Sequence, residues 1–535
     1  MNKIHIGKLE EYLIKFIIIV SWPILNIYLN IFCDKKTIII SSIIIIIFLI
    51  FFLKKIKIKT IDKKYFWISL LISIYTNNIF IDIIKTNLNT IISNNFYSSI
   101  FYLVIGTIIL PSIIFIVYCV IINLKNYLKK IEKLSKVEKR YLIITIIIAS
   151  VVSFAVVNNS TAFGSTNNYD YDIIYTSDSS YLTKIDVWSN IGCLENDIRQ
   201  PFFGVFSLPF AIIAHLVSDL VFFIPKSYSY EFTMIITQYI LIALSIIFLT
   251  RILKVKEKNK KYLYSLLTLN YPVILFGLLL EQYAVSLFYL ILTIYMFKIN
   301  KKDEINNAYI AAVGTLSTSV VLFPLITKYD NFKNWFKKVF KCFKNTIVVL
   351  ILSGRLTLFF TLHKRLNFLL GFTGTAVSFY DKLCQYLNFI VTLFLSNKGI
   401  ITYDKNITSG LIYYSYQMDK TSSLNIVGII ILLICLISYI LNRKEYMAKI
   451  SFGWVFFSVI VLLFIGWGTA ENGLILYSLY FYWAFYVLYY LLLKKLIKNE
   501  KIFNYIILIS SILIFIKSIP TLYDLINFAI KYYPR

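Results

Sequence analysis

The chain has 535 residues, of which 59 % are hydrophobic and 15 % charged, and its mean hydropathy is +0.75. A soluble fold cannot bury so much apolar side chain, so the composition predicts a polytopic membrane protein. The formal net charge of +27 comes mostly from lysines in short segments between apolar runs, so it does not indicate a nucleic-acid partner. Six cysteines without CxxC spacing predict neither a zinc site nor a disulfide framework.

The lysine clusters predict the topology of the chain. If all of them lie in the cytoplasm, the N-terminus is cytoplasmic and about 13–14 apolar segments, among them 262–280 and 345–361, can cross the bilayer. The expected fold is all-α, a polytopic transmembrane helical bundle in the cell inner (plasma) membrane. Its expected parts are N-terminal helices (1–140), a transmembrane core (141–361), and an outer segment followed by C-terminal helices (362–535).

This topology predicts which engineered cysteines a membrane-impermeant reagent reaches. Labelling from outside is expected near Ser165 and Asn406 but not near Lys258, because Lys258 belongs to a cytoplasmic cluster. Modification at Lys258 in sealed membranes would overturn the assignment.

A polar outer loop, residues 158–200, inverts the basic bias of the chain. Acidic side chains gathered at a membrane surface can act as acid, base or metal ligand. This loop contains only two basic residues, Lys184 and Arg199. It contains six acidic residues: Asp170, Asp172, Asp178, Asp186, Glu195 and Asp197.

Asp178 is the first candidate for a catalytic base, because the serines around it leave its carboxylate accessible. It can equally be a solvated loop residue or the cap of a helix that starts near Tyr181. Glu195 and Asp197 are the further acidic candidates and could hold a divalent metal ion. Arg199 could grip a donor phosphate with its planar fork, or pair with those two carboxylates.

Two elements follow the next spans. Residues 306–327 are apolar but have basic residues at both ends, so a hairpin of two half-depth helices bending near Ser317–Ser319 is expected, buried in protein or lining a wet cavity. Residues 328–345 alternate aromatic residues and lysines at helical spacing, which predicts an interfacial amphipathic helix on the anionic inner leaflet. This helix is either a plain anchor or a contact for a lipid phosphate.

Further cations and a polar tip complete the outer face. Arg355 lies in the apolar run ILSGRLTLFF and must face a cavity or a partner, since a charge at that depth is costly. With Lys364 and Arg365 it could receive a lipid-linked phosphate, or the latter two could simply snorkel to the interface. The tip at residues 467–473 offers Glu471 and Asn472 as sugar contacts. The aromatic ladder that follows it is expected to pack or to face lipid.

Several of these stretches resemble the GT-C superfamily of membrane glycosyltransferases, over roughly residues 141–330. The resemblance is carried by the acidic outer loop with YTSDSSYL, by the Arg199-Gln200-Pro201-Phe202 stretch, by the Leu280-Glu281-Gln282-Tyr283 turn and by GTLSTSVVLFPLI at 314–326. The chain departs from the superfamily in having about four extra helices before the loop and no adjacent acidic pair.

The resemblance implies transfer of a sugar from a polyprenyl-phosphate donor to a cell-envelope glycan, lipid or protein at the outer face. Glu281 and Tyr283 would contact the substrate, and membrane lipid would surround the enzyme. The alternatives are a lipid-linked oligosaccharide flippase or transporter, and an envelope glycan polymerase or ligase. A flippase should show two-fold internal repetition, and the sequence has none.

Overall fold

The structure is a computed structural model. It describes residues 3–29, 35–55, 60–88, 96–129, 131–163, 173–175, 177, 199–201, 203–221, 224–299, 302–326, 331–352, 356, 366, 370–396, 399–403, 412–416, 423–470 and 473–535. The fold is all-α, as predicted. Apart from the helices, the described residues form two short antiparallel sheets of two strands each.

The chain divides into two compact units, which are considered separately. Unit 1 comprises residues 1–133, 185–208 and 343–363, and unit 2 comprises residues 134–184, 209–342 and 364–535. Two helices are shared by the units, α7 (Phe203–Leu220) and α14 (Phe332–Leu352).

The described part of unit 1 includes four long helices, and hydrogen bonds between polar side chains join some of them. The Asn26 amide donates to the hydroxyls of Ser41 and Ser42, each at 3.0 Å, and Ser21 bonds to Ser112. Such bonds join helices where lipid offers no hydrophobic force between them. The elements are β1 (Lys3–His5), α1 (Lys8–Leu29), α2 (Lys35–Lys55), β2 (Thr60–Asp62), α3 (Lys63–Leu88) and α4 (Phe96–Leu128).

Unit 2 holds the larger helical core. Its first elements are α5 (Lys136–Asn159), α8 (Lys226–Ile252), η3 (Glu257–Asn259), α9 (Lys260–Thr268), α10 (Tyr271–Leu278), α11 (Tyr283–Lys298), α12 (Lys302–Thr315), η4 (Ser317–Val321) and α13 (Leu322–Ile326). Its later elements are α16 (Phe379–Thr392), β3 (Gly399–Tyr403), β4 (Ile412–Tyr416), α17 (Ser423–Asn442), α18 (Tyr446–Ser458), η5 (Val459–Phe464), η6 (Gly473–Tyr477), α19 (Ser478–Leu496) and α20 (Glu500–Tyr532).

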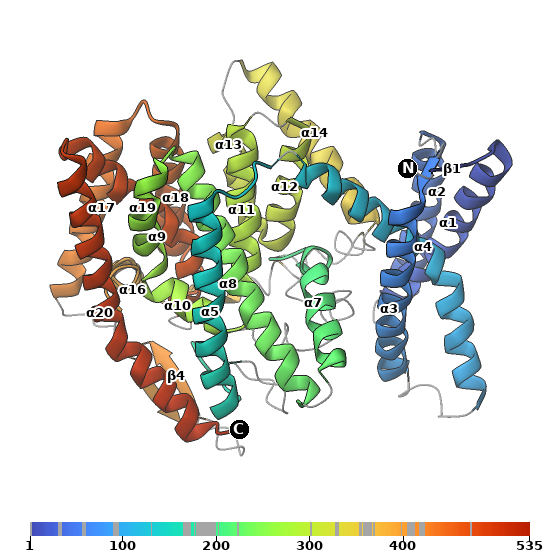
Figure 1. The fold of residues 1–535 in the computed structure, drawn as a ribbon, viewed down its shortest axis with the longest axis horizontal. Coiled ribbons are helices and arrows are strands. Elements are labelled where there is room, and N and C mark those ends of the chain that lie inside the picture. The colour runs from blue at the N-terminus through green and yellow to red at the C-terminus, as the bar shows by residue number, and fades with distance from the viewer. Residues whose placement is uncertain are drawn as a thin grey trace. The chain divides into compact units, whose positions relative to one another are not determined.

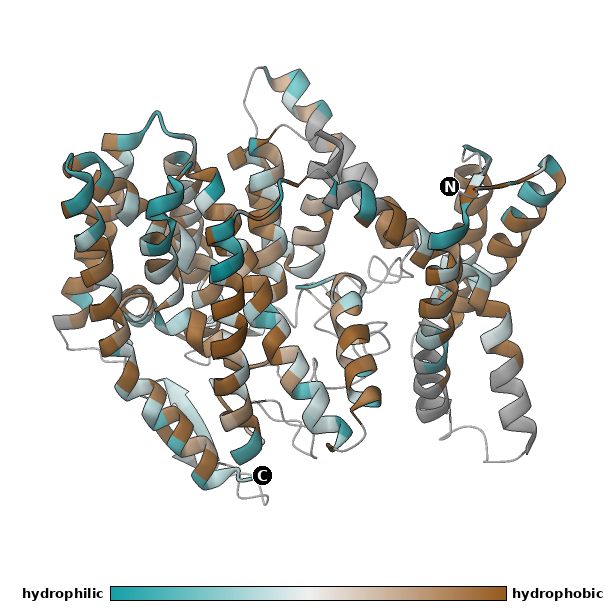
Figure 2. Ribbon diagram, viewed as in Figure 1, coloured by the Kyte–Doolittle hydropathy of each residue, from teal (hydrophilic) through white to brown (hydrophobic). Residues whose placement is uncertain are grey.

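The described residues include eight helices long and apolar enough to cross a membrane. Figure 2 shows apolar residues along most of α5, α17 and α20, with hydrophilic residues at their ends. The buried aromatic ladder of α19 packs inside the protein rather than facing lipid: Tyr480, Phe481, Tyr482, Trp483, Phe485 and Tyr486 are each at most 2 % exposed.

Contacts between distant segments define two ends of unit 2. At the end that we call the lysine end, Glu138 of α5 meets Arg251 of α8, and Glu500 of α20 meets Lys258. At the opposite end, which we call the loop end, Ser160 after α5 contacts Tyr533 after α20. Helices α5, α8 and α20 therefore run the length of the unit (Figure 1).

Two elements differ from their predicted form. An interfacial helix at 328–345 and a separate span at 345–361 were expected. One continuous helix, α14 (Phe332–Leu352), covers the described parts of both. The expected span 262–280 is divided into α9 and α10 at Leu269–Asn270. Asn270 caps α10 by accepting the N–H of Val273 at 3.1 Å, with Pro272 in the first turn.

Candidate functional site

The turn between α10 and α11, residues 279–282, lies inside the bundle. Gln238 of α8 holds it: its side-chain amide donates to the carbonyl of Leu279 at 3.0 Å and accepts the N–H of Glu281 at 2.9 Å. Gln238 is twelve residues from the start of α8, which corresponds to about 18 Å of helix. Figure 1 shows α10 partway along α5 and α8. The turn is therefore buried inside the helical bundle, and Gln238 satisfies its backbone there.

Glu281 is 2 % exposed, and its Oε2 accepts the backbone N–H of Gln282 at 3.0 Å. A carboxylate at this position is stabilised by the N-terminal dipole of α11, which follows directly. The Oε1 atom of Gln282 is also buried, and it has no hydrogen-bond partner among the described residues. Buried acceptors are normally bonded to protein or water, so the turn offers a carboxylate and an amide oxygen suited to hydroxyl donors.

Three segments distant in sequence meet this turn. The N–H of Leu280 donates to the carbonyl of Phe163, at the start of the acidic loop, at 3.2 Å. The rings of Tyr283 and Tyr477 meet edge to face at 5.8 Å. The Ser286 hydroxyl donates to the carbonyl of Thr315, at the end of α12, at 3.2 Å. The predicted substrate contacts Glu281 and Tyr283 therefore lie near the start of the acidic loop, the end of η6 and the end of α12.

The hairpin predicted at 306–327 is present. Helix α12 ends at Thr315, η4 turns the chain, and α13 folds back, since the Tyr309 hydroxyl donates to the carbonyl of Val320 at 3.0 Å. The hydroxyls of Ser319 and Tyr480 are 2.6 Å apart, which ties the bend to α19. Ser319 is buried at the bend, whereas Val320, the next residue, is 54 % exposed.

The polar tip between α18 and α19 is joined to the protein rather than free. The π-helical turn η5 precedes two glycines with positive φ, Gly466 at 74° and Gly468 at 79°. The N–H of Gly468 donates to the carbonyl of Phe372 at 2.9 Å, and the Gln385 amide donates to the carbonyl of Thr469 at 3.2 Å. Glu471 and Asn472 lie outside the described residues.

Residues 173–175 and 177 of the acidic loop are held against α10 and β4. The Tyr175 N–H donates to the carbonyl of Tyr414 at 2.9 Å, and the hydroxyls of Tyr175 and Tyr271 are 2.6 Å apart. Tyr175 has a φ of 53°, a conformation rare for a bulky residue and one that surrounding contacts must hold. Burial raises the pKa of Tyr175 well above its usual range and that of Tyr414 to about 12, so both phenols stay neutral.

The remaining predicted site residues are not brought together by these contacts. Asp178, one residue beyond Ser177, lies outside the described residues, as do Glu195, Asp197, Arg355, Lys364 and Arg365. Arg199 belongs to unit 1 and the Glu281 turn to unit 2. Among the residues that the structure describes, no three His, Cys, Asp or Glu side chains form a group that could hold a metal ion.

Sequence reasoning missed two buried polar groups of α8, Gln238 and Glu231. Gln238 is 2 % exposed within an apolar span, and a polar residue at that depth is a signal that could have identified it. Glu231 is fully buried and pairs with Arg535, whose backbone N–H reaches the carbonyl of Asn159 at 3.3 Å. The pairing joins residues 304 positions apart, and no local pattern in the sequence indicates it.

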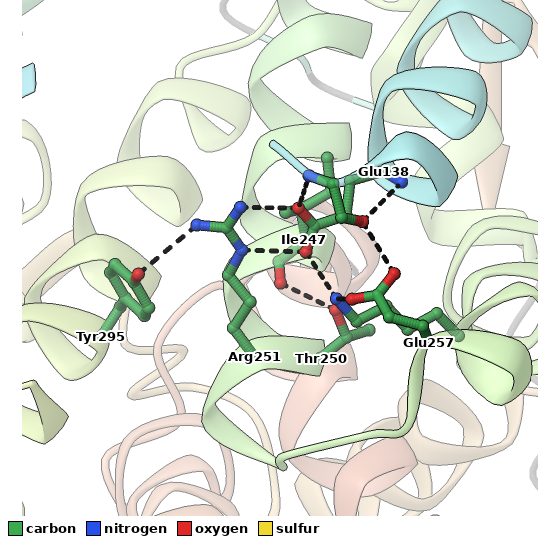
Figure 3. Close-up of polar contacts among 8 residues, drawn as sticks. Glu138, Ile247, Thr250, Arg251, Glu257 and Tyr295 are labelled. Carbon is green, nitrogen blue, oxygen red and sulfur yellow. Dashed lines mark hydrogen bonds and ion pairs between the residues drawn. The ribbon is translucent and has the colours of Figure 1, made fainter. Parts of the chain in front are cut away.

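The lysine end is tied by a buried ion cluster, shown in Figure 3. The Arg251 guanidinium binds both oxygens of Glu138, with Nε to Oε1 at 2.8 Å and Nη2 to Oε2 at 2.6 Å. Lys260 reaches Oε1 of the same carboxylate at 2.7 Å and also contacts Glu257. All three side chains are buried: Glu138 is 1 % exposed, Arg251 is 8 % exposed and Lys260 is 7 % exposed. The cluster joins α5, α8 and α9.

The broken helices and the buried polar groups between them are contained in a bundle of long apolar helices. The chain is a polytopic membrane protein. Comparisons with family models, with curated proteins and with solved structures find no match.

Replacing Gln238 by leucine is expected to destabilise the protein by about 1–3 kcal/mol, because the N–H of Glu281 and the carbonyl of Leu279 lose their partner in a dry interior. Thermal unfolding of the purified protein measures the effect. Thr237→Val is the matched control, since the Thr237 hydroxyl only donates back to the carbonyl of Thr233, at 2.8 Å. Equal effects of the two substitutions would contradict a specific role of Gln238.

Proposed function

We propose that this protein is an integral membrane glycosyltransferase that works at the loop end. It would transfer a sugar from a polyprenyl-phosphate donor to a cell-envelope acceptor. The observation that carries the proposal is the docking of the acidic loop on α10 and on the turn after it, through Tyr175 and Tyr271 at the start of α10 and through Phe163 and Leu280 in the turn. Asp178 follows Tyr175 by three residues.

The chemistry of sugar transfer needs a general base, polar groups that bind sugar hydroxyls and a cation that binds the donor phosphate. A general base must take the proton of the acceptor hydroxyl, and Asp178 is the candidate nearest to the anchored segment. Polar contacts must hold sugar hydroxyls, and Glu281 and Gln282 supply buried acceptor oxygens. Arg199 is the candidate for the donor phosphate, which a guanidinium binds through two parallel hydrogen bonds.

A transporter or flippase is the second candidate, favoured by the breaks at α9–α10, α10–α11 and α12–α13. Discontinuous helices are common around transport sites. Alternating access would require the lysine end to open, however, and the Glu138 cluster ties three helices there. Truncating one partner of a buried ion pair costs about 3–5 kcal/mol, so repeated opening of this end is unfavourable.

The two candidates are separated by cross-linking the lysine end. Ser135 and Glu257 are exposed enough to react, and their side-chain oxygens lie 2.7 Å apart. Cysteines at both positions, joined by a short bis-maleimide, should leave sugar transfer from a labelled polyprenyl-phosphate donor unchanged. A single-cysteine variant treated with the same reagent is the control. If the cross-link stops lipid translocation in vesicles and no glycosidic product forms in either state, the protein is a transporter.

A further inference from the structure

The first half of α14, residues 332–341, exposes a row of aromatic rings. Phe332, Phe336 and Phe340 are 63 %, 52 % and 58 % exposed. Their rings stack along the helix, with centroids 5.9 Å apart for the first pair and 6.4 Å apart for the second. The helix start is fixed by Asn331, which accepts the N–H of Asn334 at 2.8 Å. Large exposed apolar patches on an ordered helix mark an interaction surface.

The charges beside this row identify what covers it. Residues 331–344 contain five lysines (Lys333, Lys337, Lys338, Lys341 and Lys344) and no acidic residue. At about 100° per residue, Lys333 and Lys337 lie beside the line of rings, and both are exposed. A second copy of so basic a helix would repel the first, and a purely acyl environment would leave the ammonium groups without partners. A leaflet with anionic headgroups satisfies both the rings and the lysines.

We propose that residues 332–341 form a docking surface for anionic phospholipid headgroups, with the three phenylalanine rings entering the acyl region and the lysines binding headgroup phosphates. Long lysine side chains can reach the headgroup level while their stems cover apolar surface. The sequence alone leaves open whether this helix is a plain anchor. The exposed ring row together with the unbalanced positive charge favours selective binding of anionic lipid, and this holds whether or not the protein transfers sugars.

Hydrogen exchange of the full chain in nanodiscs tests the proposal. Amides of residues 332–341 are expected to exchange at least about tenfold more slowly in discs containing phosphatidylglycerol than in discs of phosphatidylcholine alone. High salt should reduce the difference, because it screens charges at the membrane surface. The variant with Lys333, Lys337, Lys338 and Lys341 changed to Gln should lose the difference between the lipids.

A matched control removes four exposed lysines elsewhere, Lys494, Lys495, Lys498 and Lys501, also changed to Gln, and should keep the difference. A third variant, with Phe332, Phe336 and Phe340 changed to Ser, should lose protection in both lipids. Exchange in α19 reports whether each variant is folded. Equal exchange of residues 332–341 in the two lipids, with α19 protected, would overturn the proposal and leave either a protein contact or an uncharged anchor.

Discussion

Asp178→Asn is expected to lower the rate of sugar transfer by about 10²–10⁴-fold, the usual contribution of general-base assistance. Asparagine keeps the size of the side chain and removes its basicity, so donor binding should change little. A transfer assay in reconstituted membranes with a polyprenyl-phosphate sugar, run beside a donor-binding assay, separates the two quantities. Asp186→Asn, in the same loop, is the matched control and should transfer at nearly the wild-type rate.

Arg199→Lys should give the opposite pattern, with weaker donor binding, because one ammonium cannot reproduce the planar fork of a guanidinium. If Asp178→Asn transfers sugar at the wild-type rate, Glu195 or Asp197 is the base instead. Full activity of Asp178→Asn, Glu195→Gln and Asp197→Asn alike would argue against an enzyme whose base lies in this loop.

Glu138→Gln is expected to cost about 3–5 kcal/mol of unfolding free energy, because Arg251 and Lys260 would remain buried without their shared carboxylate. The thermal unfolding temperature in detergent should fall by at least several degrees.

Glu500→Gln provides the control for this loss. Glu500 also meets two lysines at the lysine end, Lys256 and Lys258, but these are 69 % and 70 % exposed and water screens the pairs. A much smaller shift is therefore expected. Similar shifts in the two variants would mean that the Glu138 cluster does not hold the helices together.

Composition and periodicity were sufficient for the membrane class and for elements whose pattern is local. The hairpin at 306–327 was predicted because this apolar stretch looks like one span but has basic residues at both ends, and η4 lies at the expected bend. The break at Asn270 was missed, although an Asn followed by Pro272 is a helix-start signal. Residues 262–280 form an apolar run of the length of one membrane span, so a single unbroken helix was predicted there.

The site was predictable only in part. The Leu280-Glu281-Gln282-Tyr283 turn was identified from its acidic residue. Its burial inside the bundle involves a hydrogen bond from Glu281 to Gln238, which is 43 positions away. Two other contacts also join segments that are remote in sequence. The tip is bonded to Phe372 and Gln385, and Tyr175 is bonded to Tyr271. Hydropathy patterns carry no information on such pairings.

The contacts of Ser160 with Ala529 and Tyr533 span 369 and 373 positions. A ribosome adds about 5–20 residues per second, so the partners of Ser160 emerge roughly 20–70 s after it does. Until then the start of the acidic loop, and with it the Phe163 contact to the Glu281 turn, lacks its support from α20. The loop end is thus the last part of unit 2 to close during synthesis. It is where insertion chaperones and quality-control proteases of the membrane have the longest opportunity to act.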